Sequence, residues 1–78
     1  MTPGQWYGSP GCLPVLVLWV ETRPGHAVMH GLRLHRNGTT QKQTYPYATA
    51  RRMLLIGRPD GAEVAETRAE NDYGVRGG

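Results

Sequence analysis

Apolar residues gather between positions 13 and 20 (LPVLVLWV), and from Val15 to Thr22 they lack the alternation expected of a strand with one face in water. Such a run of β-branched, aliphatic and aromatic residues is typical of a strand that is covered on both faces or lies at the centre of a sheet. The Arg23-Pro24-Gly25 sequence then interrupts it. We therefore expect a core strand near 15–22.

A second strand is predicted at 27–36, where apolar and polar residues alternate. Asn37-Gly38 follows, the pair best suited to a two-residue type I′ turn. The next segment, 39–45 (TTQKQTY), has little apolar content and suits an edge strand. The pattern predicts a hairpin in which Arg36 lies opposite Thr39.

The segment before Gly57 favours a helix, because 48–56 (ATARRMLLI) is rich in helix formers and Pro46 stands near its start. We expect a short helix near 47–56 whose apolar stripe packs on the sheet. A strand is the alternative, since the turn sequence 58–61 (RPDG) could connect it to a further strand.

Residues 62–69 are ambiguous. Val64 among alanines and glutamates favours an edge strand, while a weak helix capped by Asp60, with Glu63 three positions on, is the alternative.

These elements predict the α+β class: a small antiparallel sheet in the order β-β-β-α-β, with one short helix packed on it. A small all-β, SH3-like barrel, in which the helix is a strand, is the alternative. The domain would span 13–70, preceded by a flexible or capping arm, 1–12, and followed by a frayed tail, 71–78. The predicted core consists of the apolar positions of the periodic segments, Val15, Val17, Leu18, Val20, Leu32, Leu34, Met53, Leu54 and Val64.

The chain has 78 residues, which allows one domain with a limited core. Its only cysteine, Cys12, excludes a disulfide within the chain and favours a reducing compartment. The apolar run is far shorter than the ~20 residues that a membrane-spanning helix needs. A signal peptide has a basic residue before its apolar run, and here no Lys or Arg precedes the run. We therefore expect a cytoplasmic protein with no membrane segment.

The charged residues are unevenly distributed along the chain, and this bears on the choice of partner. Between Thr22 and Pro59 there are seven basic residues and no acidic one, whereas from Asp60 onward five acidic residues accompany two arginines. This asymmetry suggests an anionic partner for the middle of the chain, most commonly the phosphate backbone of a nucleic acid. The alternative is that the acidic segment neutralises the basic hairpin within the fold. The candidate contact residues are Arg33, Arg36, Lys42, Arg51 and Arg52.

We expect these five side chains to form one contiguous positive surface. The predicted turn places Arg33 opposite Lys42 on one face of the hairpin, and Arg51 and Arg52 fall outside the apolar stripe of the expected helix.

Candidate chemistry is sparse. Ser9 is the only serine and lacks the glycine spacing of a nucleophile elbow, and no phosphate-binding glycine pattern is present. In a strand His26 and His30 would lie ~13 Å apart and His35 would face away from His30, so a shared metal ion is not expected. We therefore expect no catalytic residues, no metal site and no cofactor.

Two functions are consistent with these observations. The first is a small non-enzymatic accessory protein that binds nucleic acid through its basic hairpin. The second is an inhibitor or adaptor whose basic face docks on an acidic surface of a larger protein. The sequence indicates neither a small-molecule substrate nor an oligomeric state.

Overall fold

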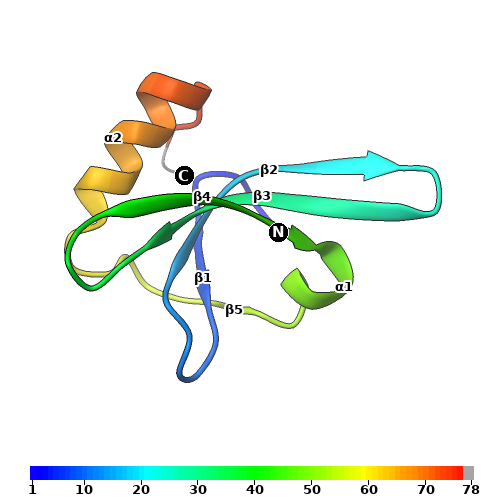
Figure 1. Ribbon diagram of the computed structural model, residues 1–78, viewed down its shortest axis with the longest axis horizontal. Helices are drawn as coiled ribbons and strands as arrows, with labels where there is room; N and C mark the ends of the chain where they lie inside the picture. Colours follow the sequence, from blue (N-terminus) through cyan, green and yellow to red (C-terminus); the bar gives the residue numbers. More distant parts are fainter. Residues whose placement is uncertain (77–78) are drawn as a thin grey trace.

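The computed structural model describes residues 1–76, which form an open antiparallel sheet of five strands with a helix across one face (Figure 1). Across the sheet the strand order is β4-β3-β2-β1-β5. The predicted α+β class is confirmed, and because the sheet does not close, the barrel alternative is wrong. In chain order the elements are β1 (Trp6–Gly8), β2 (Val15–Arg23), β3 (His26–Leu34), β4 (Thr40–Pro46), α1 (Tyr47–Ala50), β5 (Leu54–Leu55) and α2 (Ala62–Tyr73).

The β2 and β3 strands form a long hairpin whose tip projects beyond the rest of the molecule (Figure 1). A bulge between Val17 and Trp19 interrupts their register. Such a bulge changes the face toward which the following residues point. Trp19 consequently lies on the same side of the sheet as α2, 6.0 Å from the ring of Tyr73.

The β3–β4 hairpin is present, but its turn has three residues instead of the predicted two. The His35 backbone N–H donates to the Thr39 carbonyl (2.8 Å), so Arg36 does not lie opposite Thr39. Gly38 has a positive φ of 86°, whereas Asn37 does not and instead accepts the Thr39 N–H through its side chain. This is the geometry of a type I turn followed by a glycine bulge, a second hairpin turn that the Asn-Gly pair suits.

The extra turn residue shifts the pairing of the whole hairpin by one position. Arg33 lies opposite Gln41, and Lys42 lies opposite Leu32. Because neighbouring residues of a strand point to opposite faces, Arg33 and Lys42 are on opposite sides of the sheet. The predicted Arg33–Lys42 pair is therefore wrong.

On one face of the sheet the core lies beneath α2. Large strand residues there meet small helix residues: the cluster contains Trp6, Leu16, Leu18, Leu32, Leu34, Ala62, Ala65 and Ala69.

The predicted strand at 62–69 is wrong, because alanines at 62, 65 and 69 form one helical face that approaches the sheet closely. Gly61, not Asp60, occupies the N-cap. Val64 points away from the core, with 52% of its surface exposed.

On the opposite face a smaller cluster of Val15, Val17, Met29 and Ala50 lies beneath α1. The predicted helix at 47–56 is too long, since α1 ends at Ala50 and the chain then turns to pair β5 with β1. Met53 is half-buried on this face, but Leu54 is 64% exposed. Of the predicted core, Val20 is also only half-buried, while the remaining members in β2 and β3 are buried.

The N-terminal segment, expected to be an arm or loop, contributes β1 to the sheet between β2 and β5. Trp6 is buried in the core, and its indole N–H donates to Glu66 on α2 (3.2 Å). At the other end α2 extends to Tyr73, so the predicted tail at 71–78 begins within the helix. Its last two positions, 77–78, lie outside the described residues.

Candidate functional site

The five predicted contact residues share one property. Within residues 1–76, none of Arg33, Arg36, Lys42, Arg51 and Arg52 has a carboxylate oxygen within 4.0 Å. Every other arginine of the chain has one: Arg23, Arg58, Arg68 and Arg76. Carboxylates of the acidic helix α2 pair with Arg58, Arg68 and Arg76, and Glu21 of β2 pairs with Arg23, whereas the predicted contact residues have no carboxylate partner in the described part of the chain.

Arg58 illustrates a neutralised arginine. Its guanidinium donates to both carboxylate oxygens of Glu66, at 2.7 to 3.0 Å. These bonds hold the pKa of Glu66 below its ordinary value and raise that of Arg58. Such an arginine would have to leave its partner before it could bind another anion.

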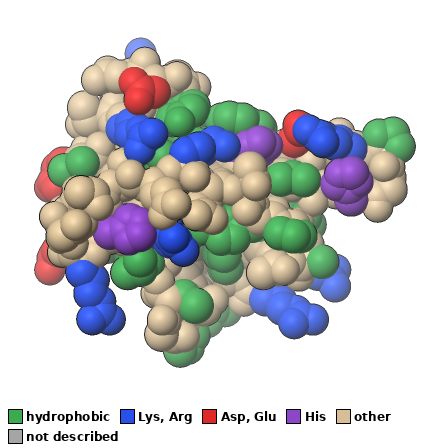
Figure 2. All heavy atoms as spheres, in the orientation of Figure 1, with side chains coloured by type: hydrophobic (Ala, Val, Ile, Leu, Met, Phe, Trp, Pro, Cys, Tyr) green, Lys and Arg blue, Asp and Glu red, His purple; other side chains and the backbone are tan. Residues whose placement is uncertain are grey.

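The five residues do not form the single surface that we expected. Figure 2 shows Lys and Arg side chains at separate places on one face of the molecule. Arg33 and Arg52 come together around one cavity, and Arg51 lines a separate hollow with Tyr47. Lys42 lies on the opposite side of the sheet, where its ammonium group contacts His30 and Trp19.

The cavity shared by Arg33 and Arg52 lies on the α1 side of the sheet and has a volume of about 570 Å³. It is open to solvent on one side, and its walls come from the β1–β2 loop, the ends of three strands, and α1 with the turn after it. No acidic residue lines it: the lining residues are Ser9, Gly11, Cys12, Leu13, Val15, Arg33, Tyr45, Thr49, Arg52 and Met53. We call it the α1 cavity.

Two polar atoms at the α1 cavity are buried without a hydrogen-bond partner, Nε of Arg33 and the hydroxyl of Tyr45. Arg33 is held in place because another of its nitrogens donates to Gln41 (2.8 Å). Burial raises the pKa of Tyr45, an effect that nearby Arg33 partly opposes, so the phenol stays protonated. Both atoms are therefore hydrogen-bond donors that lack an acceptor.

Sequence reasoning found Arg33 and Arg52 from charge but missed Tyr45. The observed register places Tyr45 opposite Met29, on the face that also carries Arg33. Tyr45 is the one aromatic residue of the otherwise polar β4 arm, and this signal was present in the sequence.

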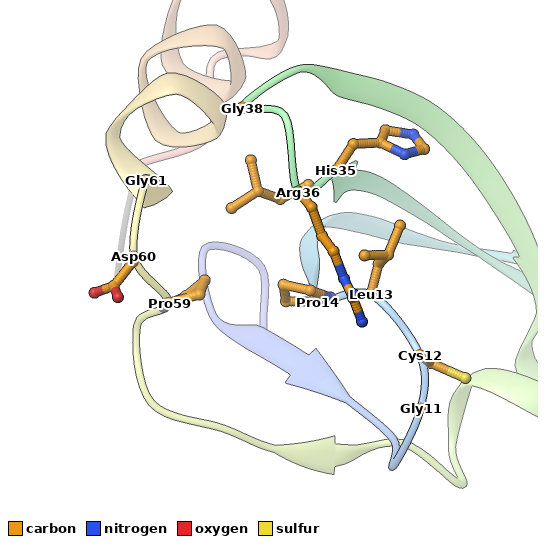
Figure 3. Close-up of a pocket in the computed structure, with 11 residues that line it drawn as sticks. Gly11, Cys12, Leu13, Pro14, His35, Arg36, Gly38, Pro59, Asp60 and Gly61 are labelled. Atoms are coloured by element: carbon orange, nitrogen blue, oxygen red, sulfur yellow. The ribbon is translucent and has the colours of Figure 1, made fainter.

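A second cavity, of about 520 Å³, lies on the other side of the β1–β2 loop (Figure 3). Cys12, His35 and Asp60 all line it, which raises the question of a catalytic triad. Figure 3 shows the Cys12 sulfur and the Asp60 carboxylate directed away from each other and from the His35 ring. Arg36 extends along the cavity toward Leu13 instead. These side chains do not form a triad in this arrangement.

A third group of side chains surrounds His30, whose ring stacks on Trp19 with centroids 4.3 Å apart. Lys42 donates to Nδ1 of His30 (2.9 Å), which leaves the proton of the neutral ring on Nε2. Burial, and then the charge of Lys42, lower the pKa of His30. Glu21 lies 3.9 Å from Nε2, too far for a hydrogen bond. We assign this group a structural role, because His30 is enclosed by its own neighbours.

In residues 1–76 no three His, Cys, Asp or Glu side chains lie close enough to hold a metal ion. Over the same range, no helix is long and apolar enough to cross a membrane. Comparison with protein-family models found no match, and comparisons with curated proteins and with solved structures found none either.

Proposed function

We propose that the protein is a small non-enzymatic binding protein whose partner is a nucleic acid, contacted on the α1 side by Arg33, Arg51 and Arg52. One observation supports this most: within residues 1–76 these three arginines have no carboxylate partner, whereas Arg23, Arg58, Arg68 and Arg76 each have one. An arginine without an internal partner contacts a phosphate at no cost in broken ion pairs.

A nucleic acid suits this distribution better than a single acidic side chain would. Its phosphates repeat along the backbone, so it meets positive charges that are spread over one side of a protein. The three arginines line two hollows, and both hollows include residues of α1 and of the turn after it, so a continuous strand could contact them in succession. Lys42, on the opposite side, would make no contact.

The test is fluorescence anisotropy with labelled duplex and single-stranded DNA of one length, over a series of salt concentrations. For three phosphate contacts on a duplex, the logarithm of the association constant should fall with the logarithm of salt concentration with a slope of roughly −3. The double substitution Arg51→Gln/Arg52→Gln should weaken binding and reduce the slope to roughly −1.

A matched control removes the same charge from arginines that have carboxylate partners, Arg23→Gln/Arg76→Gln. This variant should bind nearly as well as the unmodified protein. Equal weakening by both double substitutions would mean that net charge alone drives binding, and the proposal would fail. It would also fail if the unmodified protein bound neither DNA at low salt.

A second candidate function is docking on another protein, and a different observation favours it. Leu54 and Leu55 form β5 at an edge of the sheet, and each is 64% exposed. An apolar edge strand can pair with a strand of a partner. This function predicts no DNA binding at any salt concentration and a partner interaction that is lost in Leu55→Lys.

A further inference from the structure

We propose that the α1 cavity binds a single nucleotide, with the phosphate at Arg33, Tyr45 and Arg52 and the base or sugar against the apolar wall. The proposal rests on the proposed function for its choice of ligand, because it takes the anion to be the phosphate of a nucleic acid.

The size and lining of the cavity fit a small organic anion. Ligand pockets commonly have volumes of ~300–1,000 Å³ and combine apolar walls with a few placed polar groups. At about 570 Å³ the α1 cavity falls within this range, and Leu13, Val15 and Met53 supply apolar surface. A bare phosphate ion would leave most of this volume unfilled. A nucleotide carries both the anion and an apolar body.

The polar groups of the cavity select a negative charge. Two arginines and no carboxylate are among its lining residues. The guanidinium group of Arg33 is oriented by its bond to Gln41, which reduces the side-chain ordering that ligand binding would require. Arginine is also the side chain best matched to the geometry of a phosphate group.

The two donors without an acceptor are the strongest indication of a ligand. A buried donor that makes no hydrogen bond destabilises a folded protein, and such atoms in a native structure call for an explanation. Nε of Arg33 and the hydroxyl of Tyr45 are both in this state at the same cavity. A phosphate oxygen could accept a hydrogen bond from each, and phosphate has enough oxygens to serve both at once.

Neither donor is accessible to water in the structure, so lining side chains must move when a ligand enters. Arg52 and Met53 follow α1 in a turn, outside the helices and strands. Both are long and unbranched, and such side chains change rotamer readily. Their movement would open the cavity without breaking the pairing of the sheet.

The experiment is an NMR titration of the isotopically labelled protein with thymidine 5′-monophosphate, with thymidine and inorganic phosphate as the comparison probes. We expect saturable shifts of the amides of Arg33, Tyr45 and Arg52 with the monophosphate. Binding of each comparison probe should be at least ~10-fold weaker, since each supplies only half of the interactions.

The decisive variant is Tyr45→Phe, which removes the hydroxyl and keeps the ring. It should weaken monophosphate binding about 10-fold, because a hydrogen bond to a charged group is lost, while folding is retained. Arg33→Gln should weaken binding at least as much. The control is Tyr47→Phe, two residues away and outside the cavity lining, which should bind normally.

The outcomes separate this proposal from the proposed function. If Tyr45→Phe binds the monophosphate as tightly as the unmodified protein, or if no binding saturates at millimolar concentration, the nucleotide site is wrong, whether or not DNA binds. If the monophosphate binds as expected but DNA does not bind at low salt, the site stands as a small-ligand site and the proposed function is wrong.

Discussion

Gly31 lies opposite Val17 in the β2–β3 pairing, and replacing it with alanine tests the packing of the sheet. A Cβ atom there would lie 2.5 Å from Cγ1 of Val15, and 3.1 Å from both the Leu16 carbonyl oxygen and the sulfur of Met29. Cβ contacts shorter than 3.0 Å essentially do not occur in proteins, so the neighbours must shift. Overpacking of this kind costs about 1–3 kcal/mol. Gly31→Ala should therefore lower the free energy of unfolding by that amount.

Urea denaturation followed by circular dichroism measures the change, and the thermal midpoint should fall by ~4–8 °C for each kcal/mol in a domain of this size. Adding Val15→Ala removes the nearest clashing atom, so the double variant should be less destabilised than the sum of the two single variants. The control is Gly57→Ala, where a Cβ meets nothing within 4 Å and stability should stay the same or rise. A Gly31→Ala protein within ~0.5 kcal/mol of the unmodified one would mean that Gly31 is not packed this closely against Val15.

Two further predictions concern stability. Leu34→Ala should lower the free energy of unfolding in urea by about 2–5 kcal/mol because Leu34 is buried beneath α2, whereas Val64→Ser on the exposed side of α2 should change it by less than ~0.5 kcal/mol. A larger loss in Val64→Ser than in Leu34→Ala would mean that α2 presents its other face to the sheet. The pKa of His30 is lowered from its ordinary 6.5 in the folded protein, so the unfolded chain takes up the proton first as the pH falls. The contribution of neutral His30 to the free energy of unfolding should therefore be fully present above pH 6.5 and be lost as the pH falls below it. In unfolding curves recorded between pH 7.5 and 5, His30→Gln should make this decline shallower; an unchanged decline would mean that other groups cause it.

The central hairpins were predictable because their signals are local. The apolar run of β2 has both faces covered, by α2 and by α1, and its bulge further obscures any alternation. Asn37-Gly38 indicated the second hairpin correctly but not its register, because a glycine with positive φ serves both a two-residue and a three-residue turn. The surface we expected around Arg33 and Lys42 depended on that single position.

The segments outside the hairpins were harder to predict, since tertiary contacts decide them. β1 has only three residues, and they become a strand because two other strands flank them. In α2 the buried residues are alanines, while Val64, the larger apolar residue, faces water. From hydrophobicity alone one expects the larger side chain to be buried, but the close approach of helix and sheet leaves room only for the smaller ones. The α1 cavity was unpredictable for the same reason, because it joins five separate segments.

The position of β1 between β2 and β5 has a consequence for how the chain assembles during synthesis. The β2–β3–β4 meander contains only short-range pairings, so it can form as soon as residue 46 is available. β1 is made first, but it links β2 to a strand that is made only afterwards, and β5 pairs with no other strand in the described part of the chain. The indole N–H of Trp6 also donates a hydrogen bond to Glu66 of α2. Proteolysis after Gly8 would therefore release β5 and loosen α2, so that a cut near the start of the chain would reduce order mainly in its C-terminal part.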